Sequence, residues 1–455
     1  MNKKENKISK EKKINKKLAR RNYSNQTGIT LIALVVTIVV LLILAGVSIN
    51  ALFSENGIIK RAQDAQNKMN NAQESDLNAL NDLDKWINNQ VNGITGGGTT
   101  GGDANPSTTP KISTLVGTVV DKNTKAEDAY GNKITIPKGF KILEHNPTSS
   151  TGAVTYNYTN SEETGEHIPA VQDGIVIEDT QTGTAGNQFV WVPVGTIKNK
   201  NGSTNTITLG RYEFDSSTGA LKSTTPAQVA SVENCTKIVT ISKGGTDYQE
   251  LSTFREGNSA TNSTAQNATA RNLEEFISTT LANGGYYIAR FEASGTASKI
   301  TSKYNQTVLG NITQPNAAKA AREMYGEIKE NNKLVYASDL VNSYAWDTAI
   351  VFIQTYSGKT DYASHNESIT TKAFTATGKN NDKYCNIWDM SGNAYEWTTE
   401  YSAYSRDSNF YPCVYRGGYY FTDYGEAYDY TSYRVSIYTT DSNSYISLRS
   451  LLYVK

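Results

Sequence analysis

The chain has 455 residues and equal numbers of basic and acidic side chains, 44 of each, but the two signs are unevenly distributed. Residues 1–28 contain ten Lys or Arg and two Glu, so this segment carries a charge of +8 and the remainder carries −8. An acidic body argues against a nucleic-acid partner, because phosphate binding requires a basic surface. The length allows one large core or two moderate ones.

Cysteine and histidine are scarce, with three of each in the whole chain. His145, His167 and His365 have no paired ligand spacing, so we expect surface histidines and no zinc site. An odd cysteine count does not indicate a disulfide scaffold, and whether Cys385 and Cys413 pair stays open. No organic cofactor is expected.

An apolar segment without any charged residue follows the basic leader and runs from Ile29 to Phe53. As a helix it would be about 37 Å long, which is enough to cross a bilayer. The positive flank would keep the N-terminus in the cytoplasm and place the C-terminal bulk outside the membrane. A secretory signal peptide is the alternative, but its apolar run would be shorter and a small-residue cleavage site would follow it.

The Gly that precedes this apolar run resembles the class III signal of type IV prepilins and pseudopilins, over roughly residues 20–60. The resemblance implies that a prepilin peptidase cuts after Gly28, that Ile29 is then methylated, and that other pilins are partners. The family usually has Glu at the fifth mature position, where this chain has Ala33. A buried carboxylate that pairs subunits in a filament is thus missing, which favours a minor or tip subunit, or a membrane-retained protein.

Beyond the membrane segment, apolar residues recur every three or four positions from Ile58 to Ile87. This periodicity predicts that residues 29–90 form one long helix with an amphipathic outer part. Residues 91–110 are rich in Gly and Thr and predict a flexible linker.

From Lys111 onward the sequence predicts short strands separated by turns, with β-branched and aromatic runs at 133–143, 173–179, 187–195 and 284–293. Helices are predicted at 270–283 and 337–356. Ser338 and Asp339 are expected to cap the second helix.

Several of these segments resemble the formylglycine-generating-enzyme and sulfatase-modifying-factor family, which is built on a C-type-lectin-like fold. The resembling pieces occur in the family's order, namely "NQFVWVPVG", "GGYYIARFEAS", "SYAWDTAIVFI", "YCNIWDMSGNAYEWTTEY", "YRGGYY" and "LRSLLYVK". The resemblance implies a loop-rich α+β domain at 185–455, preceded by a β-rich segment at 111–184. The expected fold class is therefore α+β, with a long membrane- and pilin-like helix before a C-type-lectin-like domain.

The turn within "NIWDMSGNAYEW" is a calcium site in this family. The resemblance assigns its ligands to Asp389, Gly392, Ala394 and Glu396, whose oxygens suit a hard cation. The alternative is a hydrogen-bonded turn without metal. We expect Trp388 and Trp397 to belong to the core.

The oxidase members of the family use a cysteine pair shortly after the Gly-Gly of "RGG", but this chain has Thr422 and Ala427 near those positions. A catalytic role is therefore not expected. A sulfatase-modifying-factor-like enzyme remains one alternative function, and a structural minor pilin or pseudopilin is another.

The last 55 residues hold thirteen of the 29 tyrosines, among many Ser, Thr, Asp and Asn. This composition is typical of antibody paratopes, where Tyr gives contact area with few rotatable bonds. We expect Tyr415 and Tyr453 to be buried, whereas the other tyrosines cannot all fit in a core.

The pattern also resembles the variable proteins of diversity-generating retroelements, in which changing polar and tyrosine positions stand among fixed framework residues. The framework would be Arg416, Gly417, Gly418, Arg434, Leu448, Arg449 and Leu452. The candidate ligand-binding positions are Tyr419, Tyr420, Thr422, Asp423, Tyr424, Tyr428, Asp429, Tyr430, Ser432, Tyr433, Tyr438 and Asn443. The sequence thus predicts a protein anchored in the cell membrane or at a pilus tip, with an extracellular domain that binds a protein or glycan.

Overall fold

The chain divides into two compact units, Met1–Asn105 and Pro106–Lys455. The computed structural model describes residues 35–36, 109–157, 159–160, 165–235, 237, 239–243, 245–250, 268–331, 333–366, 373–402, 404–406, 409–420 and 430–455. Apart from Val35 and Val36, the predicted leader and the predicted 29–90 helix lie outside these ranges, as do Gly28 and Ile29. In the described ranges, no helix is both long and apolar enough to span a bilayer. The division between the units falls inside the segment that the sequence predicts as a linker.

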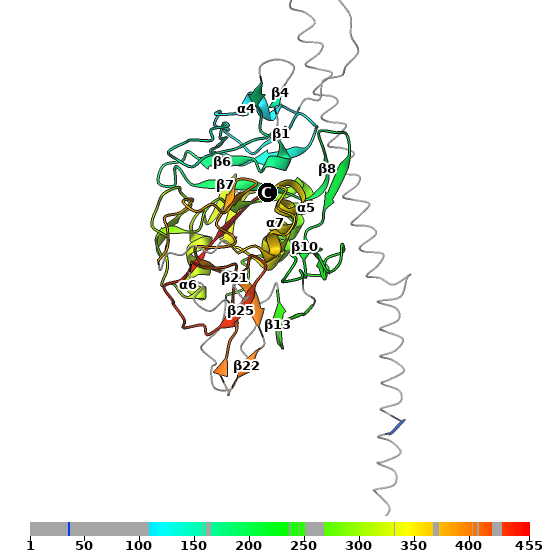
Figure 1. The fold of residues 1–455 in the computed structure, drawn as a ribbon, viewed down its shortest axis with the longest axis vertical. Helices are drawn as coiled ribbons and strands as arrows, with labels where there is room; N and C mark the ends of the chain where they lie inside the picture. The colour runs from blue at the N-terminus through cyan, green and yellow to red at the C-terminus, as the bar shows by residue number, and fades with distance from the viewer. Residues whose placement is uncertain are drawn as a thin grey trace, which may run out of the picture. The chain divides into compact units, whose positions relative to one another are not determined.

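The second unit is mostly β-structure with few helices in its described part (Figure 1). One antiparallel sheet has the strand order β17 (Glu327–Glu330), β18 (Lys333–Leu340), β27 (Ser450–Val454), β14 (Gly285–Ala289), β7 (Gln188–Pro193), β6 (Val176–Asp179) and β3 (Phe140–Ile142). The C-terminal strand β27 therefore lies in the middle of the sheet. The strands predicted near 133–143, 173–179, 187–195 and 284–293 are confirmed.

The central strands of this sheet are buried along their whole length because helices cover them. Every residue of β7 and β14 is buried, which fits their nearly continuous apolar and aromatic sequences. Trp191 packs edge-on against Tyr287 at a centroid separation of 4.9 Å, and both are fully buried. This core holds the N-terminal half of the unit to the C-terminal strand.

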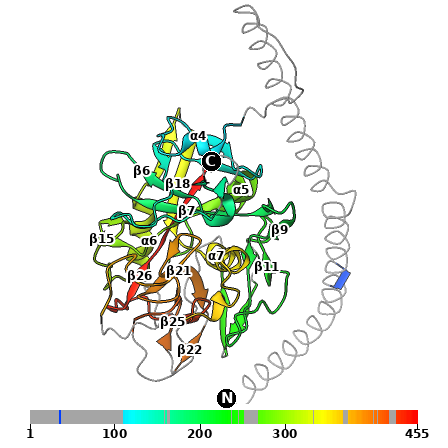
Figure 2. The same cartoon turned by 45° about the horizontal axis from the view of Figure 1, so that its top comes forward.

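A second sheet has the order β12 (Ile241–Lys243), β13 (Thr246–Gln249), β21 (Tyr395–Ser402), β24 (Cys413–Arg416) and β25 (Arg434–Ile437), with β26 (Ile446–Leu448) pairing in parallel with β21. The strand β21 directly follows the turn of "NIWDMSGNAYEW". Strands β24 and β25 both lie within the tyrosine-rich last 55 residues. Both lie toward the end of the unit where β22 (Ser405–Arg406) is found (Figures 1 and 2).

Four α-helices are described in the second unit: α4 (Ile112–Leu115), α5 (Leu273–Asn283), α6 (Gln314–Glu323) and α7 (Ser343–Tyr356). The side chain of Asn272 caps α5 by accepting from the Glu275 amide, and the left-handed Gly284 ends it. α5 confirms the helix predicted at 270–283. α6 was not predicted, although Pro315 in its first turn and its alanines are helix signals.

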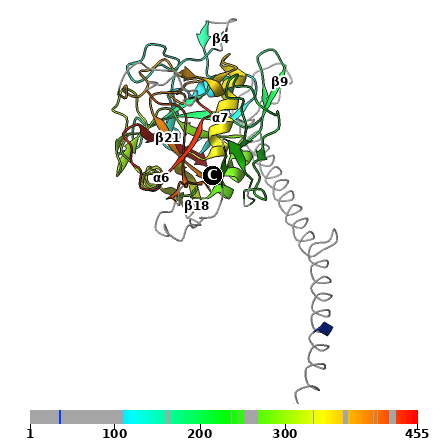
Figure 3. The same cartoon turned by 60° about the horizontal axis from the view of Figure 1, so that its bottom comes forward.

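The predicted helix at 337–356 is correct only from Ser343 onward. Residues 337–340 belong to β18, where they pair with β27, and Asn342 rather than Ser338 or Asp339 caps the helix. The pairing of a whole strand outweighs the local capping signal. α7 is buried over most of its length and lies beside β21 (Figure 3).

Short two-stranded pairs and two 3₁₀ turns complete the described part of the unit. The pairs are β1 (Thr124–Glu127) with β2 (Lys133–Ile136), β4 (Thr159–Asn160) with β5 (Glu166–His167), β8 (Gly195–Lys198) with β9 (Thr204–Ile207), β10 (Gly210–Arg211) with β11 (Gln228–Val229), β15 (Ser294–Thr296) with β16 (Lys299–Thr301), β19 (Lys383–Tyr384) with β20 (Ile387–Trp388), and β22 with β23 (Asn409–Phe410). The turns are η1 (Val171–Asp173) and η2 (Tyr362–Ser364).

Candidate binding surface

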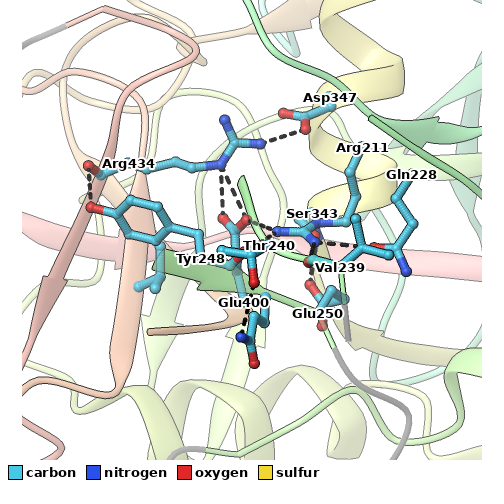
Figure 4. A network of polar contacts seen from close by, with 12 residues as sticks. Arg211, Gln228, Val239, Thr240, Tyr248, Glu250, Ser343, Asp347, Glu400 and Arg434 are labelled. Carbon is cyan, nitrogen blue, oxygen red and sulfur yellow. Dashed lines mark hydrogen bonds and ion pairs between the residues drawn. The ribbon is translucent and has the colours of Figure 1, made fainter. Parts of the chain in front are cut away.

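A buried ionic network joins the strands that carry the tyrosine-rich region to the helix α7. Glu400 of β21 accepts from Arg211 at 2.8 Å, from Arg416 at 3.3 Å and from Arg434 at 3.1 Å. Asp347 of α7 accepts from Arg416 at 2.6 Å and from Arg434 at 2.5 Å. Figure 4 shows Arg211 and Arg434 reaching Glu400 from different sides. Three guanidinium groups thus share two carboxylates, and all five side chains are at most 4% exposed.

Burial alone would raise the pKa of Glu400, but the guanidinium groups of Arg434, Arg416 and Arg211 together lower it to about 2. Glu250 behaves differently, since burial raises its pKa to about 7 although Ser343 and Thr399 donate hydrogen bonds to it. Glu400 is therefore a fixed anion at neutral pH. This arrangement holds β21, β24, β25 and α7 in one geometry.

The predicted framework glycine Gly417 stands where the chain leaves β24. Its φ is +81°, and a Cβ built there would approach the Met390 carbonyl oxygen at 2.7 Å. Replacing Gly417 with Ala should therefore lower the free energy of unfolding by about 2 kcal/mol, because strain and a backbone clash add together. Gly358→Ala is the matched control, since Gly358 has a φ of +79° and open space around it. If urea unfolding showed that both variants lose the same free energy of unfolding, a clash at Gly417 would be contradicted.

A group of tyrosines, here called the 419 cluster, covers the start of β21 and the end of β24. It comprises Tyr395, Tyr415, Tyr419, Tyr420 and Tyr445. Tyr395 stacks on Tyr419 at a centroid separation of 4.6 Å, and Tyr419 contacts Tyr445 at 5.4 Å and Tyr420 at 5.6 Å. Tyr395 and Tyr415 are buried, whereas the other three are half-buried. The cluster thus presents partly exposed rings on a buried aromatic base.

A second group, the 438 cluster, consists of Tyr404, Tyr411 and Tyr438. Tyr411 lies 4.4 Å from Tyr438 and 5.8 Å from Tyr404 between ring centroids, and the hydroxyls of Tyr411 and Tyr438 are 3.0 Å apart. All three are half-buried. Mutual stacking limits their rotamers, so less entropy is lost when a ligand packs on them.

A pocket of about 460 Å³, here called the 430 pocket, lies beside the 438 cluster and shares Tyr404 with it. Its other lining residues are Ser216, Lys243, Thr246, Tyr248, Tyr430, Tyr433, Arg434, Val435 and Ser436. Volumes of this size are usual for sites that hold small molecules or single side chains of a partner. The pocket connects the framework residue Arg434 with the surface.

The structure brings together several of the predicted ligand-binding residues. Tyr419, Tyr420, Tyr433, Tyr438 and Asn443 are half-buried. Tyr430 and Ser432 are each 5% exposed, so Ser432 offers almost no surface, whereas Tyr430 still lines the 430 pocket. Thr422, Asp423, Tyr424, Tyr428 and Asp429 lie outside the described residues.

Burial agrees with the expectations for the framework and the core. Tyr415 is 8% exposed and Tyr453 is 1% exposed, as predicted. Trp388 and Trp397, at 9% and 0%, belong to the core as expected. The predicted framework residues Arg416, Arg434, Leu448, Arg449 and Leu452 are also buried. Sequence reasoning missed Lys243, Tyr404 and Tyr411 as candidate binding residues, because only the fold brings Lys243 to the rings of Tyr430 and Tyr433, and Tyr411 to the rings of Tyr404 and Tyr438.

The turn before β21 is closed by an ion pair. Both oxygens of Glu396 accept from Arg449, at 2.5–3.1 Å, and both residues are fully buried. The Gly392 carbonyl accepts from the Ala394 amide at 2.8 Å. Because Arg449 already neutralises it, Glu396 as placed does not fit a calcium ligand. In the described ranges, no three His, Cys, Asp or Glu side chains are grouped to hold a metal, and calcium at Asp389, Gly392, Ala394 and Glu396 stays a prediction.

The three cysteines are free thiols, so Cys385 and Cys413 do not pair in this structure. Burial raises the pKa of Cys413 to about 12 and also raises the pKa of Cys385. Both are therefore protonated at neutral pH, whereas a cysteine nucleophile requires the thiolate.

His167 is exposed, as the sequence predicted for the histidines, whereas His145 and His365 are half-buried. The rings of His145 and His167 stack at 3.9 Å, and both contact the Tyr156 backbone. Burial and the nearby His167 lower the pKa of His145. His365 lies 3.9 Å from the buried Asp382. Pairing of this kind depends on contacts between distant segments, so spacing along the chain could not reveal it.

No protein-family model matches this chain, and no curated protein matches it. Solved structures similar to it include the Major Tropism Determinant I1 variant, which is 13% identical with a TM-score of 0.26, over 76% of this chain and 99% of the other. Treponema denticola variable protein 1 is 13% identical with a TM-score of 0.24, over 48% of this chain and 98% of its own. CarF is 15% identical with a TM-score of 0.26, over 38% of this chain and 87% of its own.

Proposed function

We propose that this chain is a ligand-binding protein whose binding surface consists of the 419 cluster, the 438 cluster and the 430 pocket. The observation that carries the proposal is the contrast between this surface and its base. Partly exposed tyrosines that stack on one another stand on or next to the strands β21, β24 and β25, which a buried network of three arginines and two carboxylates joins to α7. A rigid base that carries pre-organised aromatic rings and hydroxyl groups is the arrangement that antibody-like recognition requires.

The mechanism is non-covalent. Each tyrosine offers a large apolar ring and a hydroxyl that donates or accepts one hydrogen bond, so the surface suits a protein or a glycan. The protonated thiols of Cys385 and Cys413 are consistent with binding rather than cysteine chemistry. Turnover of a sulfated or thiol-containing substrate by the purified chain would support the enzyme alternative instead.

The proposal also includes the location of the surface and its origin. The N-terminal segment would anchor the chain in the membrane or at a pilus tip, with the second unit outside the cell. Retroelement-directed diversification would change the surface tyrosines while the buried arginines stay fixed. The physical support is that the ion pairs of Glu400 and Asp347 are made by the side chains of Arg211, Arg416 and Arg434, whereas the surface tyrosines contribute neutral rings and hydroxyls. A C-type-lectin-like scaffold would thus tolerate many surfaces.

The binding test uses the full chain in detergent against an array of extracellular proteins and glycans, followed by titration of each saturable binder. Tyr419→Ala with Tyr433→Ala should weaken binding at least about thirtyfold, because buried tyrosine anchors commonly contribute about 2 kcal/mol. Tyr130→Ala is the control, since Tyr130 lies in the β1–β2 turn, at the other end of the unit from β22 and β25 (Figure 1). Unchanged affinity in the double variant, or an array without saturable binders, would contradict the proposal.

Diversification is tested separately, by deep sequencing of the 3′ end of the gene across many cells. Nucleotide changes should concentrate at codons for Tyr419, Tyr420, Tyr433 and Tyr438 and spare those for Arg416 and Arg434. A neighbouring reverse-transcriptase gene with a template repeat should accompany them. A uniform sequence without these neighbours would remove the diversification proposal and leave the binding proposal intact.

A further inference from the structure

We propose that the 430 pocket binds an oxyanion, namely a carboxylate, sulfate or phosphate carried on a group about the size of a sugar or an amino acid. The inference rests on the proposed function, because it names the chemistry that one part of the binding surface recognises. Lys243 of β12 is the residue that would pair with the anion. The volume of about 460 Å³ leaves room for a ring or side chain attached to it.

The placement of Lys243 is the first observation. The side chain is half-buried, and its ammonium lies 4.2 Å from the ring centroid of Tyr430 and 4.9 Å from that of Tyr433. It also donates to the Tyr430 hydroxyl. An ammonium has three N–H donors, and among the described residues one of them is used, so two can serve a ligand. The two rings hold the amine at the wall of the pocket.

The charge around Lys243 is the second observation. At the pocket, Arg434 and Arg416 both pair with Glu400 and Asp347, and Arg211 pairs with Glu400, so this network has one more cation than anions. Glu250 compensates only in part, since burial raises its pKa to about 7. The charged groups of the described part that act most strongly on Lys243 are Arg434, Arg416 and Lys222, all positive. An anion in the pocket would lower this repulsion.

Burial, followed by the same three cations, lowers the pKa of Lys243 to about 7. The other groups that line the pocket are neutral hydroxyls, tyrosines and a valine, apart from Arg434. An anion stabilises the protonated amine, so it should raise this pKa. The affinity of the pocket for a permanently ionised anion should accordingly fall as the pH rises above about 7. A lysine with an ordinary pKa would instead give a nearly constant affinity over the same pH range.

The test measures acetylation of Lys243 in the full chain by peptide mass spectrometry, from about pH 6 to about pH 9, with the exposed Lys125 as internal control. Sulfate, phosphate and acetate are the probes, and sodium chloride matches the ionic strength. Sulfate should slow acetylation of Lys243 and raise its apparent pKa by about one pH unit, but leave Lys125 unchanged. Differences between the three probes then identify which oxyanion fits best. Equal acetylation rates at Lys243 in chloride and in all three oxyanions would overturn the proposal.

A variant pair separates this inference from the proposed function. Lys243→Met keeps a long apolar side chain, so it should weaken binding of acidic ligands about tenfold or more and leave neutral ligands unaffected. Lys125→Met should change neither. If Lys243→Met binds acidic ligands normally while Tyr419→Ala with Tyr433→Ala loses them, the oxyanion site is wrong and the binding surface stands. If both variants bind normally, the proposed function fails as well.

Discussion

Replacing Glu400 with Gln is expected to lower the free energy of unfolding by about 3–5 kcal/mol, because it leaves three buried guanidinium groups with one carboxylate. The amide still accepts a hydrogen bond but carries no charge for Arg211, Arg416 and Arg434, whose side chains are at most 4% exposed. The measurement is urea-induced unfolding of the full chain, followed by tryptophan fluorescence.

The matched control for this variant is Glu330→Gln, which removes the same charge from an exposed pair. Lys138 lies 2.8 Å from Glu330, but the two side chains are 40% and 48% exposed. Such a pair contributes at most about 1 kcal/mol. Similar losses in the two variants would show that the buried network does not hold the strands together.

The pH dependence of stability gives a second measure of the same network. The pKa of Glu400 is about 2 in the folded chain and 4.5 in its ordinary state. A carboxylate whose folded pKa is lowered stabilises the fold above its unfolded pKa, and this contribution disappears as the pH falls toward the folded pKa. The difference in stability between the wild-type chain and Glu400→Gln should therefore narrow between about pH 4.5 and about pH 2.

Local sequence patterns predicted four strands of the first sheet, β3, β6, β7 and β14. β7 and β14 were recognisable because they are short, nearly continuous apolar and aromatic runs, as buried strands require. These patterns failed where pairing with a strand distant in the sequence determines the secondary structure. Residues 337–340 have a capping signal but join β18, since β27 from the end of the chain pairs with them. Lys243 could not be recognised as a site residue for the same reason, because Tyr430 and Arg434 follow it by almost two hundred residues.

The composition of the C-terminal region was more informative than its periodicity. Thirteen tyrosines in 55 residues exceed what a core with few aliphatic residues can hold, and the rings of Tyr404, Tyr411, Tyr419 and Tyr438 are indeed half-buried. Which tyrosines turn inward depends on strand register. Tyr415 in β24 lies opposite Trp397 in β21, so it packs on the core.

Breaking the ion pair between Arg449 and Glu396 is expected to have the second large effect on stability. Arg449→Met should lower the free energy of unfolding by about 3–5 kcal/mol, because Glu396 would remain buried without a counter-charge. Arg449→Met combined with Glu396→Met should regain much of this loss, since two apolar side chains of similar length can replace a buried pair. The wild-type protein, the two single variants and the double variant form a double-mutant cycle. Its coupling energy measures the interaction between Arg449 and Glu396 directly.

The same double-mutant cycle decides how the turn before β21 is held, when it is repeated in calcium and in a calcium chelator. If Arg449 alone neutralises Glu396, the free energy of unfolding of each of the four proteins is the same in calcium as in the chelator. If calcium binds at Asp389 and Glu396, the ion should restore most of the stability lost in Arg449→Met, because it would supply the missing positive charge. The chelator would then destabilise that variant. Since β21 continues from this turn to Glu400, whichever cation holds Glu396 also positions the strand beneath the 419 cluster.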